Sequence, residues 1–373
     1  MRKIKKVALI TMSDVPNYGS MLQTYASQKV LEFLGCIVSV IDYKYPNDWQ
    51  YRSGLVRNKS WKVFIYNLVK LIFIRKSVFE DFKYRYIHCT KRFDSYAKLL
   101  SEDWNRYGII CVGSDQVWNP NYTYGDKAFL LGFVPEYIYK FSLASSFSVN
   151  TIPQNYRKLY FEKLSRLNAI SVRENNGADV VKNLGIEKRV KVILDPTLLL
   201  DRKEWNSIVS SNKVNKRKPY ILLYTMTYAF DPRPRIYEVV RYFQKRTDYD
   251  VYVISGDECG EWDIKTTKIK NVSVIEFVSY FMDASLVVTS SFHGTAFAAN
   301  FGIPLIAFVP ENKGDDRQIT LLKELDMEQC ITFVDTHIED INPYYDIDKE
   351  QKILATKRAD SLSWISATLN NRR

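Results

Sequence analysis

The sequence predicts an α/β protein with two Rossmann-like domains that face a central cleft. Apolar β-branched runs alternate with helical patterns along the whole chain, which is typical of βαβ units built on parallel sheets. The alternation restarts after Asp195-Pro196, and 373 residues are enough for two such cores. We expect a first domain over 1–170 and a second over 171–349, with a helix at 350–373 that packs back on the first.

Strands are assigned to short apolar runs, and helices to stretches with apolar residues three and four positions apart. In the first half the expected strands are 5–11, 37–41, 107–112, 140–145 and 169–172, and the helices are 20–34 and 155–167 with a basic helical region at 55–85. In the second half the expected strands are 219–225, 250–254, 271–274, 285–289, 304–308 and 330–334. The helices expected between them are 234–245, 276–283, 295–301 and 317–325. The pattern leaves the order of strands in each sheet open.

Composition indicates a reduced cytoplasmic protein. The five cysteines are scattered and form no CxxC pair, which argues against a disulfide framework and a structural zinc site. The apolar run at 7–11 is too short for the core of a signal peptide, and no uninterrupted apolar run reaches the length of about 18 residues expected of a membrane span. We therefore expect neither export nor insertion, and no metal or cofactor.

Positive charge is concentrated in residues 51–100, which hold twelve Lys or Arg and three Asp or Glu. Within 61–76, apolar residues recur at helical spacing between basic ones, as in a helix that lies on an anionic membrane. An apolar helix docked in its own domain with snorkelling basic residues explains the pattern equally well. Nucleic acid is not an expected partner, because the segment has no known reader motif. We keep 55–76 as a candidate membrane contact on the inner face of the cell membrane.

His293 is the most informative residue, because it is one of only three histidines and follows a predicted strand. Ser291, Gly294 and Thr295 surround it at the start of a small-residue helix. Ligands of open α/β sheets bind at such strand ends, and the amides of a helix amino terminus favour phosphate or carboxylate. The alternative is a histidine that only caps the helix.

Two loops of the first domain carry further candidates. Asn17 and Gly19 are expected to form a tight turn after the first strand, with Ser20 capping the helix and free amides that could hold an anion. The loop has neither GxGxxG nor GK[ST], so a dinucleotide or P-loop site is not supported. After strand 107–112, Gly113 permits close approach of the backbone and Asp115 could accept a hydroxyl proton. A purely structural turn aspartate is the alternative.

Cationic residues at later strand ends could bind an anion. Arg173 directly follows a short strand, where its rigid fork suits phosphate or carboxylate. Lys313 and Arg317 lie near the start of a helix one βα unit beyond His293, although a solvated loop would explain them too. Asp195 is interpreted as a structural contact between the domains.

Five motifs, in order and over nearly the whole chain, resemble the polysaccharide pyruvyl transferase family of bacterial envelope biosynthesis. They are NYGSMLQTYASQKVL, GSDQVWNP, ISVRENNGADVVKNLG, VILDPTLLL and SSFHGTAFAANFGIPLIAF. The resemblance implies a fold of the glycosyltransferase B type. It also implies transfer of pyruvate from phosphoenolpyruvate, a co-substrate, to a sugar as a ketal, with release of phosphate.

Within that chemistry His293 would donate a proton and Asp115 would deprotonate the sugar hydroxyl. Arg173, Lys313 and Arg317 would hold the anionic groups of the donor, beside Ser291, Gly294 and Thr295. The loop of Asn17, Gly19, Ser20 and Gly113 would serve the acceptor or an anion. The chain departs from the family at Ser291, where studied members carry an arginine two positions before the histidine.

The acceptor expected from the resemblance is an envelope sugar, such as a lipid-linked oligosaccharide. A glycosyltransferase that uses a nucleotide sugar would need the same two-domain fold. A non-catalytic carbohydrate-binding assembly protein would keep the fold and the basic helical region but would tolerate loss of His293.

Overall fold

The computed structural model describes residues 4–44, 76–209, 218–226, 230–255, 266–311 and 316–371. The chain divides into two compact units, the first formed by Met1–Leu199 and Lys357–Arg373, the second by Leu200–Thr356. The boundary between the units therefore falls after Leu199, whereas the sequence placed it between residues 170 and 171. The reason is that isolated parallel bridges tie the region of strand β6 (Ile170–Val172) to the first unit, one between Phe141 and Ala169 and one between Ser145 and Val172.

The first unit is built on a five-stranded parallel sheet in the order β3-β2-β1-β4-β5. Its strands are β1 (Lys5–Ile10), β2 (Cys36–Tyr43), β3 (Cys89–Phe93), β4 (Ile109–Val112) and β5 (Tyr139–Ser142). The central strand β1 sets the register, since Val7 lies beside both Val38 of β2 and Ile109 of β4. Strands β6 and β7 (Val190–Val192) form a separate parallel pair. The last four residues of β1 and all of β4 are fully buried, which explains their unbroken apolar sequences.

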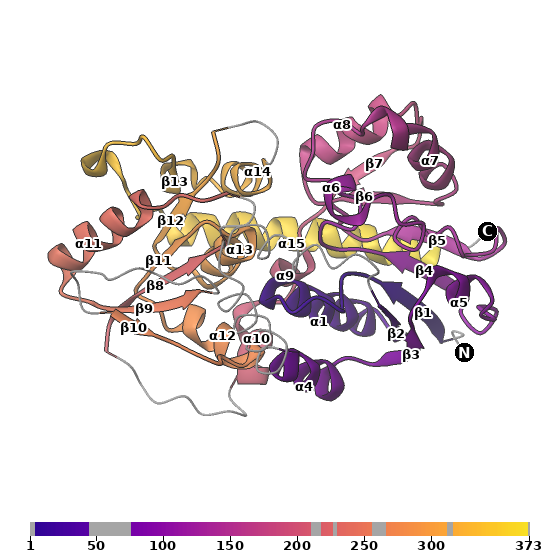
Figure 1. Ribbon diagram of the computed structural model, residues 1–373, viewed down its shortest axis with the longest axis horizontal. Helices are drawn as coiled ribbons and strands as arrows, with labels where there is room; N and C mark the ends of the chain where they lie inside the picture. Colours follow the sequence, from indigo (N-terminus) through magenta and orange to yellow (C-terminus); the bar gives the residue numbers. More distant parts are fainter. Residues whose placement is uncertain are drawn as a thin grey trace, which may run out of the picture. The chain divides into compact units, whose positions relative to one another are not determined.

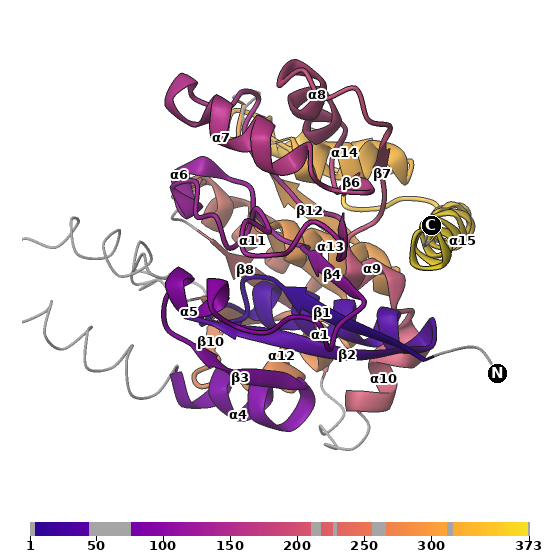
Figure 2. The ribbon, with the colours of Figure 1, turned by 90° about the vertical axis from the view of Figure 1, so that its right-hand side faces the viewer.

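Helices cover both faces of this first sheet. They are α1 (Tyr18–Phe33), α4 (Lys76–Tyr86), α5 (Tyr96–Leu100), α6 (Pro120–Thr123), α7 (Gln154–Leu164), α8 (Asn175–Asn183) and α9 (Pro196–Leu199). Figure 2 shows α4 on the side of β2 and β3 opposite to α7 and α8. Between the sheet and α7 and α8 lies a core rich in aromatic side chains, including Trp118, Phe147 and Tyr160.

The second unit repeats the design with a six-stranded parallel sheet, in the order β10-β9-β8-β11-β12-β13. Its strands are β8 (Tyr220–Thr225), β9 (Asp250–Ser255), β10 (Thr266–Lys268), β11 (Leu286–Thr289), β12 (Leu305–Phe308) and β13 (Ile331–Thr332). The helices are α10 (Arg202–Val209), α11 (Arg235–Thr247), α12 (Val274–Met282), α13 (Phe292–Phe301) and α14 (Arg317–Glu324), with 3-10 turns at Glu328–Cys330 and Ile338–Asp340. Helix α11 packs on one sheet face (Figure 1), while aromatic side chains of α12 and α13 pack on the other.

Helix α15 (Ile347–Asn370) follows the second sheet, and the division between the units falls within it. Its part from Lys357 onward belongs to the first unit. There the guanidinium of Arg358 donates to the carbonyl of Leu198 at 2.6 Å, and Ser361 Oγ accepts from the amide of Leu194 at 3.2 Å.

The two sheets share one strand order. In each of them, successive strands are first added on one side of the first strand and then on its other side, so the strand order reverses beside the first strand. These reversals fall between β1 and β4, and between β8 and β11. Ligands of doubly wound sheets bind at the carboxyl ends of the strands that flank such a reversal. The loops after β1, β4 and β11 therefore occupy the places where a site is expected.

Most predicted elements are confirmed to within a few residues, but the strand at 271–274 is wrong. Ser273 caps α12 there in a capping box, with its Oγ accepting from Glu276 N at 3.1 Å and the Glu276 carboxylate accepting from Ser273 N at 2.8 Å. Asn271 also has a φ of +56°, which is incompatible with an extended strand. The edge strand is β10 instead. Strands β3 and β7 and the short helices α5, α6, α9 and α10 were not predicted.

Candidate functional site

His293 is the second residue of α13, immediately after β11, and only 7% of its surface is exposed. The helix starts here because Ser291 is its N-cap, with an extended backbone and a side chain that accepts from the Gly294 amide. Ser291 is itself held by a hydrogen bond from its amide to Thr289 Oγ1 at 3.1 Å. Strand β11 thus fixes the first turn of α13, and with it the imidazole, at the reversal point of the second sheet.

Gly294 allows the helix to lie close to the strand. A Cβ at this position would lie 2.3 Å from Thr289 Oγ1 and 3.0 Å from Thr289 Cβ, closer than side-chain atoms pack. Thr289 cannot readily move, because its hydroxyl donates to the carbonyl of Tyr224 on β8 at 2.7 Å. Gly294 therefore serves close packing of helix on strand.

Helix α14 adds a cation and an amide to this region. The guanidinium carbon of Arg317 lies 5.6 Å from the centre of the Phe292 ring, and the Phe292 and His293 rings are 5.2 Å apart. Gln318 Nε2 donates to Thr295 Oγ1 at 2.9 Å, which fixes α14 to α13. The structure therefore brings Arg317 to the start of α13, as the sequence predicted, while the Thr295 side chain is engaged in helix packing. Lys313 lies outside the described residues.

The loops of the first unit also meet. Asn17 caps α1 by accepting from the Ser20 amide at 3.2 Å, and Gly19 lies in the first turn of that helix. Ser20 was expected to be the cap; instead its hydroxyl donates to Asp115 Oδ2 at 2.7 Å. This bond joins the loop after β1 to the loop after β4. Gly113 has a φ of +113°, and a Cβ there would lie 2.4 Å from the Leu143 carbonyl oxygen, so its close approach is to neighbouring backbone.

Arg173 lies within the first unit, not in the second domain where the sequence placed it. Its side chain is 1% exposed and faces three carboxylates, with nitrogen–oxygen distances of 2.8 Å to Asp195, 3.8 Å to Asp115 and 3.9 Å to Glu174. A buried guanidinium among these groups is part of an internal ion network. The geometry therefore argues against the predicted role in holding the donor and favours a role in positioning Asp115.

Asp195 belongs to the same network, because its carboxylate contacts side chains of the first unit. One of its oxygens accepts from Ser114 Oγ at 2.8 Å, and the other accepts from Thr197 Oγ1 at 2.7 Å. These bonds give Asp195 a structural role within the first unit, and its predicted contact between the domains stays a prediction. Ser114, and also Ser146 beside Glu174 at 2.9 Å, were missed in the sequence. The GSD run was the one available signal for Ser114.

The predicted residues thus form two groups, one in each unit. The first contains Asn17, Ser20, Asp115 and Arg173, and the second contains Ser291, His293 and Arg317. In the second group Phe292 lies between His293 and Arg317, and Gln318 joins α14 to α13. The sequence did not indicate either residue. Both positions are apolar or neutral, so charge-based reasoning passes over them.

Among the described residues no group of three or more His, Cys, Asp or Glu is arranged to hold a metal ion. Within the same ranges no helix has both the length and the apolar character needed to cross a membrane. The candidate membrane contact at 55–76 lies outside the described residues, apart from the first residue of α4.

The two parallel sheets and their reversal-point loops define a protein with two Rossmann-like units of the GT-B type. Structures of similar fold include a putative UDP-N-acetylglucosamine 2-epimerase from Listeria monocytogenes (12% identity, TM-score 0.54, 97% of this chain and 91% of that one). The UDP-GlcNAc 2-epimerase from Neisseria meningitidis, bound to UDP-GlcNAc, has 10% identity and a TM-score of 0.55 over 99% of this chain and 100% of its own. Arabidopsis thaliana UGT89C1 complexed with UDP-L-rhamnose has 8% identity and a TM-score of 0.50 over 99% and 100%.

At these identities the similarity concerns the fold alone. The family model of the polysaccharide pyruvyl transferases, in contrast, matches residues 17–312. The chain belongs to this family. No curated protein matches the sequence.

Proposed function

We propose that this protein transfers pyruvate from phosphoenolpyruvate to two hydroxyls of a cell-envelope sugar, forming a ketal and releasing phosphate. The observation that carries the proposal is the place of His293, in the first turn of α13 at the reversal point of the second sheet. Membership of the family supports the reaction class. The amides at the start of α13 favour an anionic donor, and Arg317 beside Phe292 adds positive charge.

In the proposed reaction His293 protonates the terminal carbon of the enol, since imidazole changes protonation near neutral pH. The adjacent carbon becomes oxocarbenium-like and forms a bond to the first sugar oxygen. Its bond to the phosphate oxygen then breaks, and the second sugar oxygen closes the ketal. The two sugar hydroxyls together release two protons. One of them reprotonates His293 and the other leaves with the phosphate, so the reaction is balanced.

Asp115 is the proposed base for the sugar hydroxyl. Its carboxylate is held by the Ser20 hydroxyl at 2.7 Å, and Arg173 lies 3.8 Å away. These contacts fix the direction of the carboxylate, which proton abstraction requires. In this scheme Arg173 orients Asp115 and does not touch the donor.

The deciding experiment is mass spectrometry of lipid-linked glycans from cells with and without the protein. The expected result is a pyruvate ketal only where the protein is present. Titration of the purified protein with phosphoenolpyruvate and with nucleotide sugars tests the first alternative, because a nucleotide-sugar transferase binds the nucleotide sugars. The glycan analysis tests the second, because a non-catalytic assembly protein leaves the glycans without pyruvate.

We also infer contact with an anionic membrane surface through 55–76, from the excess of Lys and Arg in that part of the sequence. Reversing the charge of Lys70, Arg75 and Lys76 should release the protein from anionic vesicles, at about 1 kcal/mol per cation. Wild-type protein that does not sediment with such vesicles at low salt refutes this contact.

A further inference from the structure

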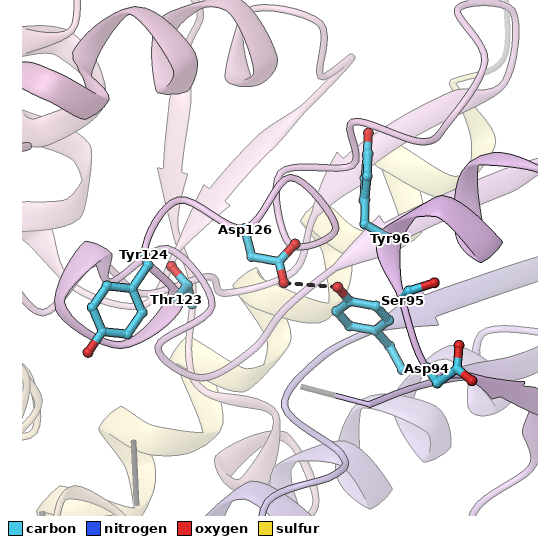
Figure 3. A pocket seen from close by; sticks show the side chains of 7 residues that line it. Asp94, Ser95, Tyr96, Thr123, Tyr124 and Asp126 are labelled. Carbon is cyan, nitrogen blue, oxygen red and sulfur yellow. Dashed lines mark hydrogen bonds between the residues drawn. The ribbon is translucent and has the colours of Figure 1, made fainter. Parts of the chain in front are cut away.

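The first unit contains an open, shallow cavity of about 330 Å³ at the carboxyl edge of its sheet. Figure 3 shows its walls, to which Tyr96, Tyr124 and the carboxylates Asp94 and Asp126 contribute. Tyr43 also lines the cavity. Tyr43 ends β2, and Asp94 follows β3, so both come from strand ends on the same edge as the loop of Asp115. A concave volume of this size, with aromatic walls and a few polar groups, is typical of small-molecule sites.

The chain shapes this cavity through two backbone features. Tyr124 and Gly125 have φ values of +49° and +68°, and this pair of left-handed residues reverses the chain after α6 and presents Asp126. On the opposite wall, a Cβ at Gly132 would lie 2.8 Å from the Tyr96 hydroxyl. Gly132 therefore leaves the room in which the Tyr96 side chain lies. The walls are held by the fold and do not depend on a ligand.

Asp126 is the best-positioned polar group. Its Oδ2 accepts from the Tyr43 hydroxyl at 3.0 Å, and its Oδ1 accepts from the Ala128 amide at 2.9 Å. Each carboxylate oxygen can accept two hydrogen bonds, so a ligand hydroxyl can donate to Asp126 while both bonds persist. Burial raises the pKa of Asp126 above its usual value, and a hydrogen-bond donor from a ligand would favour its charged form.

The charge of the cavity discriminates between ligands. Asp94 Oδ2 lies 2.8 Å from Lys98 Nζ, whereas Asp126 accepts from two neutral donors, the Tyr43 hydroxyl and the Ala128 amide. Because Lys98 pairs with Asp94, the carboxylate of Asp126 is the group that disfavours a phosphate or carboxylate ligand by like-charge repulsion. A neutral molecule with several hydroxyls and an apolar face fits instead, since its hydroxyls can donate to Asp126 and its CH groups can lie on tyrosine rings.

We propose that this cavity, lined by Tyr43, Tyr96 and Asp126, binds a neutral sugar ring of the acceptor, an assignment that rests on the proposed function. The segment from Asp115 to Asp126 connects it to the base at the reversal point, so both lie on one stretch of chain. The acceptor is thereby held on the first unit. The cavity binds the sugar through its shape, tyrosine faces and one carboxylate.

The test is saturation-transfer NMR of the full chain with methyl glycosides of glucose, galactose, mannose and N-acetylglucosamine. At least one glycoside should bind the wild type, and Asp126→Asn should weaken that binding about tenfold, as expected for loss of a hydrogen bond to a charged acceptor. Tyr96→Ala should weaken it similarly, while Tyr96→Phe should retain binding within about twofold because the ring face remains. Asp103→Asn, at an exposed aspartate of the same unit outside the cavity, is the matched control.

Two outcomes overturn the assignment: a wild type that binds none of the glycosides, or unchanged glycoside binding in both Asp126→Asn and Tyr96→Ala. If Asp126→Asn fails to fold, Tyr96→Ala against Tyr96→Phe decides the question. Calorimetric titration with phosphoenolpyruvate separates this result from the proposed function. If the cavity variants lose glycoside binding while their phosphoenolpyruvate affinity is unchanged, the cavity is supported as the sugar site. If the wild type binds glycosides but not phosphoenolpyruvate, the proposed donor is refuted and the sugar site is still supported.

Discussion

The two units have the same strand order but present different chemistry at their reversal points. In the first, the loops after β1 and β4 meet through Ser20 and Asp115, and Arg173 lies among three carboxylates. In the second, the corresponding place holds the start of α13, with His293 in its first turn and Arg317 over Phe292. The fold thus determines where functional loops lie, while the side chains on those loops determine what each place can do.

The comparison also separates two arginines that look alike in the sequence. Arg173 and Arg317 both follow strand ends, yet the carboxylates around Arg173 neutralise its charge, while Arg317 faces an aromatic ring beside the proposed acid. Arg173 therefore belongs to the internal structure of the first unit, and we propose Arg317 as the cation that holds the donor. The four predictions below test this contrast, starting with the largest expected effect.

Asp195→Ala should destabilise the protein by about 3–5 kcal/mol, because it removes the carboxylate that lies nearest to the buried Arg173 guanidinium, at 2.8 Å. Urea unfolding measures the effect. Asp360→Ala is the matched control, since that aspartate pairs with Lys191 at the surface with 58% of its side chain exposed, and it should cost less than about 1 kcal/mol. A loss for Asp195→Ala no larger than for the control would mean that the network around Arg173 is not structural.

Arg317→Ala should weaken phosphoenolpyruvate binding by about 2–4 kcal/mol if the guanidinium makes a charge-assisted pair with the donor. Calorimetric titration measures the affinity, and Arg317→Lys should restore part of it. Lys323→Ala, at an exposed position of the same helix, should leave binding unchanged. Equal affinity in wild type and Arg317→Ala would remove this arginine from the donor site.

His293→Gln should lower turnover about 100-fold or more while the fold and most donor binding persist, as expected for loss of general acid catalysis. Single-turnover formation of the ketal, alongside a binding titration, distinguishes the two effects. The control is His337→Gln, an exposed histidine of the same unit. Near-normal turnover in folded His293→Gln protein would identify the histidine as a helix cap and end the proposed mechanism.

The smallest effect concerns the pH dependence of stability at Asp126. Burial raises its pKa above the ordinary value of 3.8, so the folded state binds the proton more tightly than the unfolded state. The wild type should therefore lose stability relative to Asp126→Asn as pH rises from about 4 through the folded-state pKa, and the difference should then become constant. Urea unfolding of both proteins across this range measures it; the opposite slope would show that the carboxylate is stabilised in its charged form.

Sequence patterns predicted the two-domain α/β fold because strands such as β4 and β12 are buried on both faces and therefore continuously apolar. Edge strands escaped prediction for the opposite reason. β3 is largely exposed, with the polar sequence CTKRF, and β10 has only three residues. The Ser-x-x-Glu pattern of the capping box at Ser273 is present in the sequence, but the neighbouring valines favour a strand.

For the site, the sequence located the loops but not the partners of each side chain. His293 and Arg317 were placed near one another because adjacent βα units share a sheet edge. The neutralisation of Arg173 depends on Asp195 and on Asp115, which lies far away in the chain, and such long-range pairing leaves no local pattern. The cavity at Asp126 was missed for the same reason, since its walls come from β2, α5 and the turn after α6.

The division of the chain into Met1–Leu199 with Lys357–Arg373 on one side, and Leu200–Thr356 on the other, has a consequence for biosynthesis. The second unit is inserted into the first, so a ribosome completes the inserted unit while the earlier one still lacks the helical segment that contacts Leu194 and Leu198. Because domains fold as units during synthesis, the later-made unit can mature first. Until α15 has been synthesised, the surface of the first unit around Leu194 and Leu198 lacks its contacts with this helix and is exposed to aggregation.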